Sequence, residues 1–293
     1  MRVLLIGANG QVGWELRRTM TSIGDVVAMD RSACDLSRPH DLSEIIRDAK
    51  PDIIVNAAAY TSVDKAEKEE EIATLVNGTA VGVIAAQARQ LAALLIHYST
   101  DYVFDGTKDC LYTEDDPPNP INAYGRSKLA GERAIAQCAG DYLIFRTTWV
   151  FAARGHNFLR TILRLARERD ELSIVADQIG APTWARHIAD ATALIVQRAC
   201  RERANEQFAS GILNVTAGGA TSWWGFAEAI LEHAMEQGLL RNRPKVRPIA
   251  TSDYPLPAAR PKNSRFAQER LRKRFGIELP EWQQGLLLCM RTL

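Results

Sequence analysis

The segment VLLIGANGQVG, residues 3–13, decides the fold of this 293-residue chain. An apolar run leads directly into three glycines, Gly7, Gly10 and Gly13, and a helical pattern continues through Met20. Gly7 permits a tight turn, Gly10 lets the backbone approach a pyrophosphate, and Gly13 lets the helix pack closely on the strand. The start of the helix presents free N–H groups to phosphates. A glycine triad alone is a weak signal, but its position between a first strand and a first helix predicts a dinucleotide-binding turn.

Four more short apolar runs follow before Val150, and we expect each of them to form a strand. They are continuous and not alternating, which indicates strands buried on both faces and hence a parallel sheet covered by helices. The sequence therefore predicts an α/β fold with a Rossmann-like doubly wound parallel sheet. The predicted strands cover residues 26–29, 52–56, 93–98 and 142–145, and a crossover helix is predicted over 80–93.

Beyond Val150 the rhythm of strands and helices is interrupted by prolines. Helices are predicted near 157–168, 187–200, 223–236 and 264–274, and residues 243–261 are predicted to form a long loop. We expect residues 1–150, together with about 187–205, to form the dinucleotide-binding Rossmann domain. Residues 151–186 and 206–293 are expected to form a smaller α/β domain that binds the substrate.

Composition and charge exclude several classes of protein. The net charge of +1 gives no electrostatic support for binding nucleic acid or a membrane surface. The five cysteines are an odd number without a Cys-x-x-Cys pair, and no histidines stand at metal-ligand spacing, so neither a disulfide framework nor a structural zinc site is expected. The sequence shows no leader segment, and no apolar run approaches the ~18 residues of a membrane span. We expect a soluble, cytoplasmic protein.

Asp30 ends the second predicted strand about 20 residues after the glycine turn, where a carboxylate meets the ribose hydroxyls of a dinucleotide. Arg31 follows at once and can pair with a 2′-phosphate. The two residues together predict that both NADH and NADPH are accepted. The alternative is that Asp30 and Arg31 only form an exposed turn.

Tyr124 and Lys128 are four residues apart in a predicted helix, so both side chains lie on one helical face. A free phenol has a pKa near 10. A nearby ammonium group stabilises the phenolate and makes the phenol a better proton donor. Tyr-x-x-x-Lys is common by chance as a solvated helix pair. The pattern is more specific here because it follows a predicted strand that continues into Ser99-Thr100-Asp101.

These motifs resemble those of the extended short-chain dehydrogenase/reductase superfamily. Within it, the chain is most similar to the dTDP-4-dehydrorhamnose reductase family, and the similarity runs from residue 1 to about residue 290. The stretches that carry the finer resemblance are residues 10–16, 61–67, 97–104, 145–150, 177–183 and 260–264.

The resemblance implies a role for each of the matching residues. Tyr124 would be the proton donor, Lys128 its activator and the partner of the nicotinamide ribose, and Thr100 would hold the reacting oxygen. Asp101 and Trp149 would contact the sugar. The expected cofactor contacts are Gly7, Gly10, Gln11, Val12 and Gly13 at the turn, Asp30 and Arg31 at the ribose, Asp35 and Leu36 near the adenine, and Ala57, Ala58, Ala59, Tyr60, Thr61 and Tyr98 along the cofactor.

The reaction implied by the resemblance is NADPH- or NADH-dependent reduction of the C4 keto group of a dTDP-linked deoxysugar. A dehydratase fits less well, because the Asp101 that follows Thr100 is itself followed by Tyr102 and not by a second acid. Another nucleotide-sugar reductase or epimerase remains an alternative. So does a non-catalytic NADP-binding regulatory subunit, although such a module would be expected to lose Tyr124 or Lys128.

Three further expectations rest on weaker signals in the sequence. Arg260 is a candidate contact for a nucleotide phosphate, because a guanidinium grips phosphate through two parallel hydrogen bonds, or else it is a surface arginine. A Mg²⁺ site at Glu15 and Asp190 is disfavoured, because Arg186 stands one helical turn from Asp190. We therefore assign no metal ligands and keep Mg²⁺ only as a disfavoured alternative. A homodimer is the default oligomer for a soluble protein of this kind.

Overall fold

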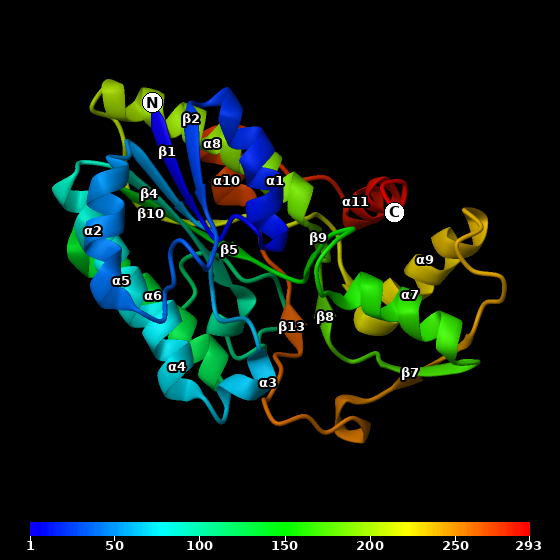
Figure 1. Cartoon of the computed structure of the whole chain (residues 1–293). Helices are drawn as coiled ribbons and strands as arrows, with labels where there is room; N and C mark the ends of the chain where they lie inside the picture. Colours follow the sequence, from blue (N-terminus) through cyan, green and yellow to red (C-terminus); the bar gives the residue numbers. More distant parts are fainter.

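The computed structural model describes residues 1–293 and is built on a six-stranded parallel sheet with the strand order β10-β5-β4-β3-β1-β2 (Figure 1). All five strands predicted from the sequence are present, and the prediction of a parallel sheet is confirmed. The sixth strand, β10, pairs with β5 and was not predicted. The strands are β1 (Arg2–Ile6), β2 (Asp25–Met29), β3 (Ile53–Asn56), β4 (Leu94–Thr100), β5 (Tyr142–Thr147) and β10 (Gly211–Asn214).

Helices cover both faces of this sheet, as its continuous apolar strands require. Val3 and Leu5 face a core shared with α1 and α8, whereas Leu4 and Ile6 face a second core shared with α2, α5 and α6. Figure 1 shows the two helical layers on opposite sides of the strands. The prediction of a doubly wound sheet is therefore confirmed. The covering helices are α1 (Gln11–Thr19), α2 (Pro39–Ala49), α5 (Ala80–Gln90), α6 (Ala123–Cys138), α8 (Ala185–Ala204) and α10 (Glu269–Phe275).

The helix that leads into α5 is long and interrupted by a π-turn. Residues Glu70–Gln90 comprise α4 (Glu70–Thr74), the π-helix η2 (Leu75–Thr79) and α5, and α5 packs against both α2 and α6. By length and composition alone this run could cross a membrane, but half of its most apolar part is buried inside the protein. Its apolar character is that of a core helix. The short helices α3 (Val63–Ala66), η1 (Met20–Ser22) and η3 (Asp101–Val103) complete this half of the chain.

Three short sheets and three helices lie at the carboxyl edge of the main sheet, and a third apolar core joins the helices to the β12-β7 and β6-β9 sheets. The sheets pair β11-β8-β13, β12 with β7, and β6 with β9. Their strands are β6 (Val150–Phe151), β7 (Glu171–Val175), β8 (Ile179–Gly180), β9 (Thr183–Trp184), β11 (Thr221–Ser222), β12 (Lys245–Ile249) and β13 (Asn263–Ser264). The helices are α7 (Phe158–Glu168), α9 (Trp223–Glu236) and α11 (Trp282–Met290).

The predicted helices near 157–168, 187–200 and 223–236 are confirmed as α7, α8 and α9. Two predictions in the C-terminal third are wrong. The predicted loop 243–261 contains β12 and the 3₁₀ turn η4 (Thr251–Asp253); β12 is an edge strand, where the missing N–H of Pro248 is tolerated. The predicted helix 264–274 begins only at Glu269, because Asn263 and Ser264 pair with β8.

The strand β10 also bears on the division into domains. The sequence assigned all of 206–293 to the substrate domain, yet Gly211–Asn214 extends the main sheet beyond β5. The strand Gly211–Asn214 lies in a stretch of chain that otherwise stays outside the main sheet. No periodic pattern in the sequence distinguishes these residues from their neighbours. The helix α10, from the same predicted stretch, also packs into the core of the main sheet. The remainder of the predicted division stays a prediction.

Candidate active site

The candidate site lies at the carboxyl ends of β1, β3 and β4, next to the point where the strand order reverses direction from β1. The glycine turn is closely packed there. Gly7 has φ +84°, and a Cβ on it would lie 2.6 Å from the backbone nitrogen of Ala58. A Cβ on Gly13 would collide with the carbonyl oxygen of Gly7. Gly10 is the N-cap of α1 and leaves the first amides of the helix without a side-chain cap. This turn fits the diphosphate of a dinucleotide.

Asp30 is joined to the glycine turn by a hydrogen bond that Asn9 Nδ2 donates to it at 2.8 Å. Hydrogen bonds from Ser32 hold the pKa of the Asp30 carboxyl below its usual value. Arg31 is exposed and forms an ion pair with Asp35 at 3.5 Å. Leu36 is buried in the core beneath them. A carboxylate and a guanidinium therefore stand side by side at the end of β2.

The segment 57–61 leaves β3 beside the glycine turn. Its Tyr60 is fixed on both sides by Asn77, because the Tyr60 N–H donates to Asn77 Oδ1 at 2.9 Å and Asn77 Nδ2 donates to the Tyr60 carbonyl at 3.0 Å. Asn77 lies in the π-helix η2 and also donates to Ser127 Oγ on α6. Sequence analysis missed Asn77. A buried amide inside an apolar helix was the signal that could have found it.

Tyr124 stands in the first turn of α6, which Asn122 caps by accepting a hydrogen bond from the Gly125 N–H at 2.8 Å. Its ring meets that of Tyr102 edge to face, with centroids 5.5 Å apart. Burial raises the pKa of the Tyr124 phenol, Asp101 adds to the rise, and a hydrogen bond with Thr100 opposes it. The structure thus brings Tyr124 and Thr100 together, and the phenol stays protonated at neutral pH.

Lys128 lies one turn further along α6 and is buried against β4. Its Nζ donates to the Tyr98 carbonyl at 2.6 Å and lies 3.2 Å from His97 Nε2. His97 Nδ1 in turn lies 3.2 Å from Asn56 Nδ2. Burial lowers the pKa of Lys128 to about 8, and the charge of Glu132 partly opposes this. His97 was not predicted from the sequence, because its contact with Lys128 joins residues 31 positions apart.

Asp101 is buried between Thr100 and Ser264. It accepts a hydrogen bond from Thr100 Oγ1 at 3.1 Å and a short one from Ser264 Oγ at 2.5 Å. Burial raises the pKa of the Asp101 carboxyl to about 6, although the hydrogen bond from Ser264 lowers it. Ser264 reaches this position because it lies in β13, which pairs with β8, and not in the helix predicted over 264–274.

Trp149 lies in the left-handed region, with φ +47°. Its indole stacks on Trp223 from α9, and it leaves no space for a side chain at Gly180, where a Cβ would lie 2.6 Å from Trp149 Cε2. Strained residues that are fixed from several sides cluster at functional sites. Trp223 is not among the site residues predicted from the sequence.

Arg260 reaches the same region from the C-terminal part of the chain. Its two terminal nitrogens each donate to the carboxylate of Asp64 at 2.7 Å, and Nη1 also donates to the Ala258 carbonyl. The fork expected to hold a phosphate is thus engaged by an acid. The assignment of Arg260 to phosphate stays a prediction.

The carboxylates considered for Mg²⁺ are paired with arginines. Glu15 lies 3.6 Å from Arg186, and Asp190 lies 3.2 Å from Arg18. No group of three or more His, Cys, Asp or Glu side chains is arranged to hold a metal ion.

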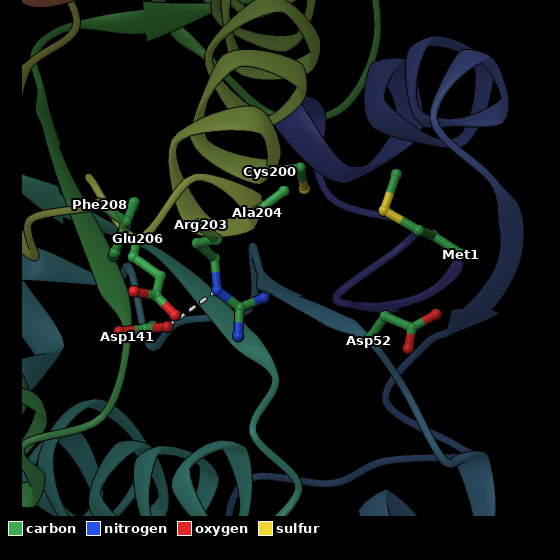
Figure 2. A pocket seen from close by; sticks show the side chains of 8 residues that line it. All are labelled: Met1, Asp52, Asp141, Cys200, Arg203, Ala204, Glu206 and Phe208. Atoms are coloured by element: carbon green, nitrogen blue, oxygen red, sulfur yellow. Dashed lines mark hydrogen bonds and ion pairs between the residues drawn. The ribbon is translucent and has the colours of Figure 1, made fainter.

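A cavity of about 600 Å³ lies at the other edge of the sheet. Met1, Asp52 and Asp141, which precede β1, β3 and β5, line it together with Arg203, which pairs with Asp141 at 2.8 Å (Figure 2). Ligands of open parallel sheets bind at the carboxyl ends of the strands. This cavity is therefore separate from the candidate active site.

Comparison with known proteins places the chain in a family. The model of the RmlD substrate binding domain matches residues 1–293. A dTDP-4-dehydrorhamnose reductase from Burkholderia thailandensis is 56% identical over 295 residues, covering 100% of this chain and 99% of that protein. The protein of the same name from Escherichia coli K12 is 45% identical, with 100% and 98% covered.

Solved structures agree with these relatives. The crystal structure of dTDP-4-dehydrorhamnose reductase from Bacillus anthracis in complex with NADP is 33% identical, has a TM-score of 0.88, and covers 100% of this chain and 99% of its own. A UDP-glucose 4-epimerase from Thermus thermophilus, 19% identical with a TM-score of 0.80, shares the fold. The resemblance found in the sequence is confirmed, and the chain belongs to the RmlD substrate binding domain family.

Proposed function

We propose that this protein catalyses the last step of dTDP-rhamnose biosynthesis, in which NADPH or NADH reduces the C4 keto group of dTDP-4-dehydro-L-rhamnose to give dTDP-L-rhamnose. The observation that carries the proposal is Tyr124, placed beside Thr100 at the carboxyl end of β4. The full-length identity with the reductases from B. thailandensis and E. coli supports this substrate.

The residues around the glycine turn suit a dinucleotide. The amides that follow Gly10 would bind the diphosphate, with Gln11 and Val12 beside it, and Asp30 would accept hydrogen bonds from the adenosine ribose. Arg31 would pair with a 2′-phosphate when one is present. When bound, the nicotinamide supplies the hydride that adds to C4 of the sugar. The NADP bound by the relative from B. anthracis supports this part of the proposal.

Tyr124 would supply the proton that the reaction needs. As the carbonyl carbon gains a hydride, its oxygen becomes an alkoxide, and the phenol transfers its proton to that oxygen. Thr100 would hold the same oxygen by a hydrogen bond. Lys128, with its amine at the Tyr98 carbonyl, would bind the nicotinamide ribose and stabilise the phenolate left on Tyr124. The keto sugar thus gains one hydride and one proton.

The groups around this centre would hold the sugar nucleotide. Asp101 is anchored by Ser264 beside Thr100, and Trp149 presents an indole supported from behind by Trp223. Arg260 would meet the nucleotide diphosphate with donors that Asp64 does not occupy. A polar anchor and an aromatic wall are the usual means of fixing the orientation of a ligand in a pocket.

The test is oxidation of NADPH, followed by nicotinamide absorbance, with dTDP-4-dehydro-L-rhamnose as substrate. Tyr124→Phe is expected to lose about 10²–10⁴-fold in turnover with the dissociation constant of NADPH retained. Tyr254→Phe, at an exposed tyrosine, is the matched control and should turn over normally. Near-normal turnover of Tyr124→Phe refutes the proton assignment. Binding of NADPH without oxidation by the parent protein favours another keto sugar first, and a regulatory subunit second.

The proposal also covers the location, oligomeric state, partners and metal requirement of the enzyme. We place the protein in the cytoplasm, as a homodimer that binds neither nucleic acid nor membrane. Because Glu15 and Asp190 are paired with arginines, addition of EDTA should leave the reduction rate unchanged. A rate that falls with EDTA and returns with Mg²⁺ would contradict the metal-free assignment.

A further inference from the structure

The loop between β6 and α7 brings an arginine to the glycine turn. Arg154 lines a cavity of about 200 Å³ at the start of α1. The other residues that line this cavity are Asn9, Gly10, Gln11, Trp14 and Gly155. A cavity bounded by a phosphate-binding turn on one side and a guanidinium on the other is suited to an anion.

The backbone of this loop is fixed to the turn. Asn157 Nδ2 donates to Gln11 Oε1 at 2.8 Å and to the Arg154 carbonyl at 3.0 Å. Asn157 also caps α7 by accepting a hydrogen bond from the Arg160 N–H. Gly155 has φ +74°, and a Cβ there would already touch the side chain of Gln11. Arg154 is therefore held beside the turn by a residue that belongs to the next helix.

The side chain of Arg154 is oriented but has no anionic partner. Its guanidinium carbon lies 3.5 Å from the centroid of the Trp14 indole, close enough for a stacked cation–π contact, and the indole is 41% exposed. The neighbouring Arg18 and Arg186 both pair with carboxylates. Arg154 forms no such ion pair, so its donors are free for a ligand.

We infer that Arg154, held on Trp14, grips the diphosphate of the bound dinucleotide, an inference that rests on the proposed use of NADPH or NADH. A guanidinium offers two parallel N–H donors that match two oxygens of a phosphate. The cavity walls formed by Gly10 and Gln11 identify the diphosphate as the ligand group. The 2′-phosphate belongs at the other end of the adenosine, near Asp30 and Arg31.

Direct binding measurements test this inference without any turnover. We would measure the dissociation constants of NADPH, NADH and ADP-ribose by calorimetry. Arg154→Ala should weaken the binding of all three ligands about tenfold or more. All three contain the diphosphate, and the variant cannot form the charge-assisted hydrogen bond to it. Arg154→Lys should recover part of the affinity, since it keeps the charge but not the fork. Trp14→Leu should give a smaller loss, because it frees the guanidinium without removing it.

Arg17→Ala is the matched control. Its guanidinium also lies near the Trp14 ring, at 5.1 Å from the centroid, but it does not line the cavity, so affinity should not change. Unchanged dissociation constants in Arg154→Ala would overturn the inference alone. A loss confined to NADPH would also overturn it, because Arg154 would then serve the 2′-phosphate. A parent protein that binds none of the three would overturn the proposed function as well.

Discussion

The indole of Trp149 lies face to face on that of Trp223, with ring centroids 3.5 Å apart and planes inclined by 8°. The two residues come from different parts of the chain, one following β5 and the other beginning α9. Trp223 is itself fixed by a hydrogen bond from its Nε1 to Gln178 Oε1 and by contact with Phe158. The position of a predicted substrate contact thus depends on a residue that does not share its sequence motif.

Removing this support should impair substrate binding selectively. Trp223→Leu is expected to raise KM for the sugar nucleotide up to about tenfold, which corresponds to the free energy of one lost aromatic pair. The dissociation constant of NADPH should be unchanged. Trp223→Phe keeps an aromatic face and should restore most of the loss. Steady-state kinetics and calorimetry measure the two quantities. An unchanged KM in Trp223→Leu would show that Trp149 holds its position without the stack.

The opposite side of Trp149 gives an independent prediction. Gly180→Ala places a Cβ 2.6 Å from Trp149 Cε2, so the indole must move although no atom of it has been removed. We expect the same rise in KM for the sugar nucleotide as in Trp223→Leu. Gly211→Ala is the control, because a Cβ there meets no atom within 4 Å. Parent-like kinetics of Gly180→Ala would mean that Trp149 does not contact the sugar.

Asp101 is expected to reduce stability at neutral pH. Burial raises its pKa in the folded protein to about 6, from an ordinary value of 3.8. Between these values the folded state binds more protons than the unfolded state, so the free energy of unfolding falls as pH rises. At pH 7 the cost is at most about 3 kcal/mol, from about 1.4 kcal/mol for each pKa unit.

Asp101→Asn should therefore raise the unfolding free energy at pH 7 while it impairs reduction of the sugar. Because the amide cannot ionise, the gain should shrink as pH falls from 7 towards 4. Denaturant unfolding at several pH values measures it. Asp253→Asn, at an exposed acid, should show no comparable gain. A variant that is less stable than the parent at pH 7 would contradict the buried-charge account.

The sequence predicts the parts of this site whose residues are close along the chain. The glycine turn, Asp30 and the Tyr124–Lys128 pair each lie within one strand, turn or helix, where spacing determines relative position. His97, Asn77 and Arg154 could not be found in this way. Each acts through a partner on another element, and only the packing of the sheet and helices determines which side chains meet.

The same reason explains the errors in the fold. The strands β12 and β13 lie at the edges of small sheets, and they exist because β7 and β8 offer backbone partners. Neither segment has the long apolar run that revealed β1 or β3. Ser264 illustrates the consequence for function, since its hydrogen bond to Asp101 spans 163 positions and follows from the pairing of β13 with β8.

Lys128 should also give a measurable pH dependence of stability. Its folded pKa is about 8, below the ordinary value of 10.5. Between these values the unfolded state binds more protons, so stability rises with pH, and the cost of the buried charge is fully present only below pH 8. Relative to Lys128→Met, the free energy of unfolding of the parent should increase by up to about 3 kcal/mol between pH 7.5 and 10. Lys245→Met, at an exposed lysine, should track the parent. A constant difference between Lys128→Met and the parent across this range would exclude a depressed pKa.

A buried ion pair lies beneath the site. Arg146 and Glu132 join β5 to α6 through hydrogen bonds of 3.0 and 2.6 Å, and both side chains are at least 96% buried. Glu132→Gln removes the charge that compensates Arg146, so we expect the unfolding free energy to fall by about 3–5 kcal/mol. Glu70→Gln breaks the Arg126 pair, which is about half exposed, and should cost only about 0–1 kcal/mol. Equal costs for the two variants would mean that water reaches the buried pair. Denaturant unfolding of the two variants beside the parent decides between these outcomes.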